Sequence, residues 1–303
     1  MKIKVSQAIP GVILLENVVG KSGRPIIKQQ TVLTEKHINI LQKFLIDEIH
    51  VSNQLDDGSR FIAQRQENHS QNNQSPTFQQ LQQSVNLYKD QFINWRKTQT
   101  IDVAQVRHTF LQLFEKTKQL DINQLIDFRE ILLKQTFYSQ QIFKSVLAVI
   151  LAKIINCDSA ELNQIGLASL LSDAGMIKYD ESFYEHPNEL FDHNLEQLKH
   201  HPVYSYRLVE DSPFMTKAAK LGILQHHERI DGTGYPLQLN DQDIHRIAKI
   251  IGLSDEFTRV LSFYLVNNKA PVKQTIIYFK NKNLNKFDRK LMSHLITQLI
   301  KNS

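Results

Sequence analysis

The sequence predicts a mainly α-helical protein with a small α+β module at its N-terminus. Glycine and proline are scarce, with 10 and 8 among 303 residues, and this argues against barrels and sandwiches because those folds need many tight turns. From about residue 78 onward apolar residues recur at helical spacing, as in Phe78, Leu81, Val85 and Tyr88. The hydrophobic share of 41% excludes a chain that is disordered throughout.

Residues 1–52 form a compact module of short strands and one helix in this prediction. Residues 11–15 and 25–27 read as two strands, and residues 21–24 form the turn between them. Thr34 then caps a helix, and residues 48–51 form a closing strand. The apolar positions of the helix are Ile40, Leu41, Phe44 and Leu45.

A Gln/Asn-rich segment, residues 53–77, follows the module. Residues 64–76 within it contain no apolar side chain to bury, so we expect a flexible linker. A helical domain then covers residues 78–303. Its later helices are expected at residues 139–156, 160–172, 194–209, 215–228, 243–263 and 271–300.

Composition excludes several classes of protein. The net charge of +5 is a mild excess over this length, so no nucleic-acid partner is expected. The single cysteine, Cys157, excludes a disulfide framework and a thiolate zinc site within one chain. The best apolar stretch, residues 145–155, contains Lys153 and is much shorter than the roughly 20 residues that cross a bilayer. We therefore expect a cytoplasmic protein.

Residues 226–236, His-His-Glu-Arg-Ile-Asp-Gly-Thr-Gly-Tyr-Pro, are the most informative run in the chain. Two histidines close a predicted helix, and two glycines and a proline then enforce a tight irregular loop. Adjacent histidines point to different sides of a helix, so both reach one cluster only if the cluster lies at the helix end. The alternative is that His226 and His227 are capping and surface residues.

This run resembles the signature of the HD-GYP family, the branch of the HD phosphohydrolase superfamily that hydrolyses cyclic di-GMP. Residues 166–177 are similar to the helix and turn that carry the family's HD pair. His201-Pro202 and Arg246-Ile247 resemble two further elements, and all of them occur in the family's order over residues 130–270. The resemblance implies a helical domain, and residues 1–52 look like the small module found before many such domains.

The resemblance also implies a metal site. Of the family's metal ligands, this chain keeps Asp173, His201, His226 and His227. One carboxylate and three imidazoles suit a single divalent ion, Fe, Mn or Zn, and in a hydrolytic member Asp173 would also be catalytic. Two alternatives stay open: Asp173 as a cap or salt-bridge partner, and His201 as a helix cap.

Ligand positions of the second metal in the family are replaced. The family's first histidine falls on or near Gln140, its HD histidine on Ser172 and its late aspartate on Gly252. A lysine after the HD pair is Met176, and an arginine that holds the substrate phosphate is Leu261. Arg259 lies two residues earlier, and a helical rotation of two residues is expected to direct it elsewhere.

The loop after the histidine pair is predicted to be a structural or partner-binding element. Arg229 and Asp231 are expected to brace it whether or not metal binds. The loop and partner residues are Glu228, Arg229, Asp231, Gly232, Gly234, Tyr235 and Pro236.

Three functions follow from this interpretation. The first is a degenerate HD-GYP protein in cyclic di-GMP-type signalling, with weak or no phosphodiesterase activity. The second is an active phosphodiesterase that uses substitute ligands such as Gln140, Asp255 or His245. The third is a binding module that recruits a partner such as a diguanylate cyclase domain. The sequence leaves the oligomeric state undefined.

Overall fold

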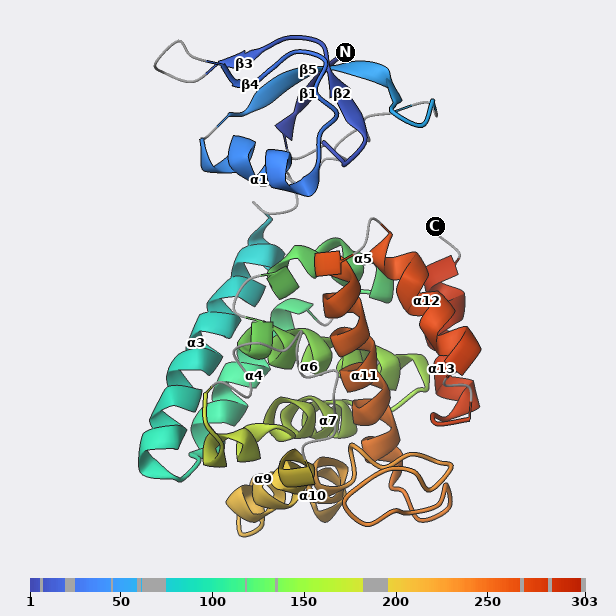
Figure 1. The fold of residues 1–303 in the computed structure, drawn as a ribbon. Coiled ribbons are helices and arrows are strands. Elements are labelled where there is room, and N and C mark those ends of the chain that lie inside the picture. Colours follow the sequence, from blue (N-terminus) through green and yellow to red (C-terminus); the bar gives the residue numbers. More distant parts are fainter. Residues whose placement is uncertain are drawn as a thin grey trace. The chain divides into compact units, whose positions relative to one another are not determined.

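A computed structural model describes residues 1–5, 8–19, 25–44, 46–58, 61, 75–117, 119–133, 136–181, 196–267, 270–282 and 285–300. The chain divides into two compact units, residues 1–69 and 70–303, which are coloured blue and cyan to red in Figure 1. The mainly α-helical class with a small α+β module is confirmed. The predicted turn at residues 21–24 and most of the predicted linker lie outside the described residues.

The N-terminal unit is built on a three-stranded antiparallel sheet with the order β1-β5-β2. A second pair of strands, β3 and β4, and one helix, α1, complete it. The elements are β1 (Lys2–Lys4), β2 (Val12–Leu14), β3 (Val18–Val19), β4 (Pro25–Ile27), α1 (Glu35–Lys43) and β5 (Glu48–Leu55). Thr34 Oγ1 accepts a hydrogen bond from His37 N at 3.4 Å, so the predicted cap of α1 is present.

The core of this unit is a small apolar cluster between the sheet and α1. It includes Val12, Leu14, Leu41 and Val51, all fully buried. Phe44 was expected to contribute, but its side chain is 60% exposed because α1 ends one residue before it. Leu45 lies outside the described residues.

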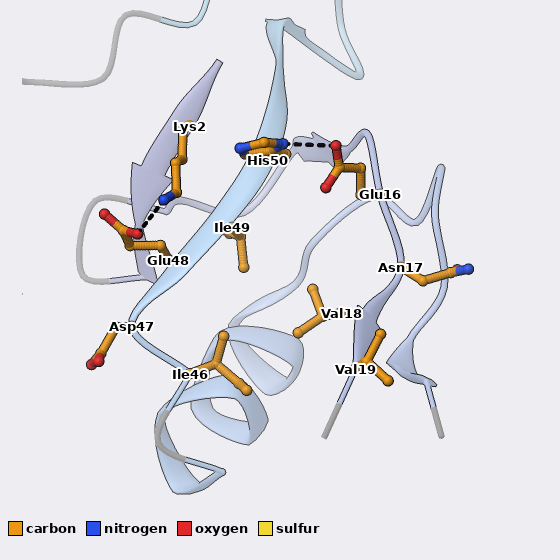
Figure 2. Close-up of a pocket in the computed structure, with 10 residues that line it drawn as sticks. All are labelled: Lys2, Glu16, Asn17, Val18, Val19, Ile46, Asp47, Glu48, Ile49 and His50. Carbon is orange, nitrogen blue, oxygen red and sulfur yellow. Dashed lines mark hydrogen bonds and ion pairs between the residues drawn. The ribbon is translucent and has the colours of Figure 1, made fainter. Parts of the chain in front are cut away.

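Figure 2 shows a pocket of about 490 Å³ in the N-terminal unit. A hydrogen-bonded pair and an ion pair lie along it, His50 Nδ1 with Glu16 Oε1 at 2.8 Å and Lys2 Nζ with Glu48 Oε2 at 2.5 Å. All four side chains are well exposed, so these pairs stabilise the unit little.

The second unit is a bundle of helices (Figure 1). Its first half contains α3 (Pro76–Thr98), α4 (Val103–Thr117), α5 (Ile122–Asp127), the 3-10 helix η2 (Arg129–Leu133), α6 (Thr136–Ile154) and α7 (Ser159–Leu171). Its second half contains the 3-10 helices η3 (Ala174–Lys178) and η4 (Glu196–His200), then α9 (His201–Val209), α10 (Lys217–Leu224), α11 (Arg246–Asn267), α12 (Pro271–Lys282) and α13 (Arg289–Ile300).

Helix α6 forms the centre of this unit. Every residue from 141 to 150 is buried, and α6 packs against α3, α7 and α11. A helix that is apolar on all sides is stable only when neighbours cover it completely. The bundle therefore encloses α6, and any charged side chain on it must find its partners inside the protein.

Two predicted helix boundaries need correction. The predicted helix at 271–300 is two helices, α12 and α13, because Asp288 begins a new one: its carboxylate accepts from Leu291 N at 2.9 Å. The predicted helix at 215–228 ends at Leu224, so His226 and His227 follow it in a turn. Within the described part of the chain, no helix is both long and apolar enough to span a membrane.

Candidate metal centre

Four side chains converge where three helical elements begin or end. Asp173 lies between α7 and η3, His201 is the first residue of α9, and His226 and His227 follow α10. One potential ligand atom from each lies within 4.8 Å of the others. The structure thus brings together the four residues that the sequence singled out as metal ligands.

Two of the histidines are oriented by backbone carbonyls. His201 Nδ1 lies 2.6 Å from the carbonyl oxygen of Leu198, and His226 Nδ1 lies 2.7 Å from that of Ile223. A carbonyl oxygen only accepts, so each Nδ1 carries a hydrogen and each Nε2 is the ring nitrogen that faces the centre. Such a second contact fixes the ring and the tautomer of a metal-binding histidine.

The Asp173 carboxylate faces these two rings. Its Oδ1 lies 3.1 Å from His201 Nε2 and 3.3 Å from His226 Nε2. Burial raises the pKa of Asp173, but the Lys144 ammonium and the contacts from the two histidines outweigh it and hold the pKa well below its usual value. Asp173 makes no capping hydrogen bond to η3. Of the two alternatives to a metal ligand, cap and salt-bridge partner, only the salt bridge is therefore present.

The histidine pair is held in the neutral form. Burial lowers the pKa of His226, and burial together with the neighbouring His226 and His201 lowers that of His227 well below its usual value. Neutral imidazole is the form that binds a metal. The donor set of three imidazoles and one carboxylate fits a single Zn, Fe or Mn ion.

Lys144 is the residue that sequence reasoning missed. It lies on α6 with none of its surface exposed. Its Nζ forms an ion pair with Asp173 Oδ2 and lies 3.3 Å from Asp255 Oδ1. It follows Gln140 by one helical turn, so the two residues share a helix face. A lysine inside the most apolar helix of the chain was the available signal, because such a charge requires a buried partner.

The residues at the replaced family positions make other contacts. Ser172 is fully buried and its Oγ donates to the carbonyl oxygen of Ser169 at 3.0 Å. At Gly252 a Cβ atom would lie 2.5 Å from the carbonyl oxygen of His226, so α11 approaches the histidine pair more closely than any other residue would allow. Met176 and Leu261 are buried apolar residues.

Two of the substitute ligands considered from the sequence have other partners. Asp255 contacts Lys144, and His245 Nδ1 accepts a hydrogen bond from Ile247 N at 3.2 Å. Neither belongs to the four-residue group found among the described residues.

The loop after the histidines is fixed by its own acidic residues. The Glu228 carboxylate accepts from Leu237 N at 2.6 Å and from Leu239 N at 2.9 Å. Asp231 accepts from the amide and the hydroxyl of Thr233 at 3.1 and 2.6 Å. Charged acceptors form strong hydrogen bonds with amides, so both side chains hold the loop in shape.

Arg229 and the loop glycines close this segment against the helices. The Arg229 guanidinium donates to the carbonyl oxygens of His226 and Glu228 at 3.3 and 3.0 Å. At Gly234 a Cβ would meet Arg229 N at 2.3 Å, and Gly232 has a positive φ of 77°. The Tyr235-Pro236 peptide bond is cis. These contacts match the expected bracing role of Arg229 and Asp231.

A cavity of about 310 Å³ opens beside the metal-ligand cluster. His227 and Tyr235 line one part of it, with ring centroids 4.7 Å apart and nearly parallel. Glu256 and four cationic side chains are also among the lining residues: Lys199, Arg229, Arg259 and Lys286. Arg259, which helical spacing had directed elsewhere, faces the same cavity as His227. The sequence rule compared positions along one helix only, whereas residues from several elements line this cavity.

Comparisons with known proteins agree with this architecture. The HD domain family matches residues 122–291, more than half of the chain. The cyclic di-GMP phosphodiesterase response regulator RpfG of Xanthomonas campestris is 32% identical over 120 residues, which are 39% of this chain and 32% of that protein. A cyclic di-GMP phosphodiesterase of Pseudomonas aeruginosa is 28% identical over 125 residues, 41% of this chain and 30% of that protein.

The chain thus spans about a third of the length of these curated relatives. A solved structure, an HDG"Y"P protein from Bdellovibrio bacteriovorus, aligns over 99% of both chains with a TM-score of 0.57 and 17% identity, which shows a shared fold. The chain belongs to the HD domain family, in its HD-GYP branch.

Proposed function

We propose that this protein is a degenerate HD-GYP member of cyclic di-GMP-type signalling that holds one divalent metal and has weak or no phosphodiesterase activity. The observation that carries the proposal is the contrast within one site. Asp173 and the three histidines gather as a ligand set, whereas Ser172 and Gly252 at two further ligand positions make packing contacts instead.

The bound metal would be held by Asp173, His201, His226 and His227. When present, the ion supplies Lewis acidity toward a phosphate oxygen. Two-metal hydrolysis stabilises both the attacking and the leaving oxygen, and the replaced positions offer no ligands for that second ion. The remaining chemistry therefore suits binding of a phosphodiester more than its cleavage.

The cationic cavity supports a phosphate-bearing ligand. Arg229 and Arg259 line it next to His227, and guanidinium groups bind phosphate oxygens through paired hydrogen bonds. The relatives named above are phosphodiesterases of cyclic di-GMP, and a related phosphodiesterase of Vibrio cholerae is specific for 3'3'-cGAMP. A cyclic dinucleotide is accordingly the proposed ligand.

The test is a paired measurement of binding and turnover on metal-loaded protein purified without oxygen. We expect cyclic di-GMP to bind with little or no release of linear product, and binding to weaken in His226→Ala. His108→Ala, at an exposed histidine on α4, is the matched control and should behave as wild type. Clear turnover that His226→Ala abolishes would overturn the proposal.

An active phosphodiesterase is the second candidate. The observation that favours it is the pair of protein cations near the centre: Lys144 contacts Asp173, and Arg259 lines the cavity. If these charges replaced the second metal in catalysis, turnover would survive in wild type and fall in both Lys144→Met and Arg259→Met. The same turnover assay decides between the two candidates.

We also propose that the loop contacts a protein partner, such as a diguanylate cyclase domain. Leu237 is the residue for testing this proposal, because it is 52% exposed and Glu228 holds its backbone amide. Co-purification with such a domain should be lost in Tyr235→Ala or Leu237→Ser. Unchanged capture by both variants would exclude the loop as the contact.

A further inference from the structure

One lysine and two carboxylates form a buried charge cluster next to the proposed metal ligands. Lys144 is fully buried, and the side chains of Asp173 and Asp255 are 12% and 15% exposed. Burying a charge is unfavourable unless partners surround it. The two carboxylates provide those partners, so the lysine is held in place by charge as well as by the packing of α6.

The two oxygens of Asp173 face different partners, imidazole nitrogens on one side and an ammonium group on the other. Oδ1 lies near the Nε2 atoms of His201 and His226, at 3.1 and 3.3 Å, whereas Oδ2 forms the ion pair with Lys144. A carboxylate that bridges two metal ions would likewise present one oxygen to each. Here one of the two directions is taken by an ammonium group that belongs to the protein.

We propose that the Lys144 ammonium stands in for a second cation at this centre and thereby weakens the binding of divalent metal there. This inference rests on the proposed metal centre and deepens it. Lys144 is a positioning residue in this role, because it holds Asp173 and Asp255.

Charge gives the physical reason. A second divalent ion would have to bind next to an ammonium that already contacts both available carboxylates, and like charges in a buried site repel strongly. Asp255 lies on α11, one turn after Gly252, and is the carboxylate nearest the vacated ligand position in sequence. Because it is committed to Lys144, it cannot compensate for the missing aspartate at that position.

The experiment measures how many Mn²⁺ ions the full chain binds and how tightly. Metal-free protein is titrated with Mn²⁺, free ion is followed by electron paramagnetic resonance, and bound metal is counted by plasma mass spectrometry after dialysis. We expect one ion per wild-type chain. In Lys144→Met the first ion should bind at least about tenfold more tightly. This lower bound comes from the loss of repulsion between the Lys144 charge and the metal ion in a high-dielectric medium.

Three comparisons separate this role from a structural one. Lys144→Arg keeps the charge and should behave as wild type. Lys153→Met places the same substitution on the last turn of α6 and should also leave binding unchanged. If Lys144→Met does not fold, Lys144→Met/Asp255→Asn removes one charge of each sign, and its affinity should exceed that of Asp255→Asn by at least about tenfold.

Each outcome decides the matter. A tighter first ion, with or without a weaker second ion in Lys144→Met, supports the inference. Equal number and affinity in wild type and Lys144→Met overturn the role of Lys144 and leave the one-metal centre standing. Two ions in wild type overturn the role of Lys144 as well. No bound ion in wild type overturns the metal centre itself.

Discussion

Gly252 provides a sharp test of the site because two physical effects on its replacement have opposite signs. It lies inside α11, where exchanging glycine for alanine stabilises a helix by about 1 kcal/mol through backbone entropy. In this structure, however, a Cβ at this position would lie 2.5 Å from the carbonyl oxygen of His226. Forcing atoms into a packed interior costs about 1–3 kcal/mol.

We therefore expect Gly252→Ala to be destabilising by about 1 kcal/mol, the difference between the clash and the helix gain. The colliding atom belongs to the backbone of His226, whose ring also faces Asp173. Relief of the clash must move that residue, so Mn²⁺ affinity should fall together with stability. Gly252→Asp, which restores the family's ligand type, meets the same obstacle.

The assay is urea unfolding of metal-free protein at pH 7. Trp95 is the single tryptophan and is buried in the helical unit, so its fluorescence reports on that unit. Gly222→Ala is the matched comparison, because its Cβ would meet the Ile247 side chain at the same 2.5 Å. A side chain yields more readily than a backbone carbonyl, so this variant should lose less stability. A Gly252→Ala protein more stable than wild type by about 1 kcal/mol would refute the reasoning.

Two acidic residues give further predictions. Burial raises the pKa of Glu256, but Arg259 and Arg229 outweigh it and lower the pKa to about 2. The stabilisation that the Glu256 carboxylate contributes is therefore complete above about pH 5 and is lost as the pH falls from 4.5 toward 2. At pH 3 the loss amounts to roughly 2 kcal/mol. Glu256→Gln should lack this part of the acid sensitivity in urea titrations at pH 7 and pH 3. Glu228→Ala removes a charged acceptor from two loop amides, so those amides should exchange hydrogen at least about tenfold faster. The exposed Glu210→Ala variant should not change their exchange, and equal protection in both proteins would contradict the bracing role of Glu228.

Much of the fold could be predicted from the spacing of apolar residues, because helix periodicity reports directly on which faces are buried. The division between α12 and α13 was missed although a local signal was present. Asp288 follows an Asn- and Lys-rich stretch and caps the next helix. Apolar spacing alone predicted one continuous helix, because both helices contribute buried residues to the same core.

The four ligands could be predicted because the motif fixes residue types at positions where helices begin or end. Helix α10 ends at Leu224, so His226 and His227 are not constrained by helical geometry. This explains how two adjacent histidines can reach one cluster. Lys144 could not be found in the same way, because the motif does not include it and its partner Asp173 lies on another element. The role of Gly252 depends on how closely α11 approaches His226, a distance that no local pattern encodes.

The replaced positions depend on one another, and this argues against repair by a single substitution. Ser172 donates to its own helix, Gly252 admits the backbone of His226, and Lys144 binds the two carboxylates. A histidine at 172 would leave the Lys144 ammonium in place beside Asp173, and an aspartate at 252 would displace a retained ligand. A ligand at 172 supplies only a missing donor, exchange of Lys144 removes only the ammonium, and any side chain at 252 meets the clash, so we expect single restorations to leave the metal count at one.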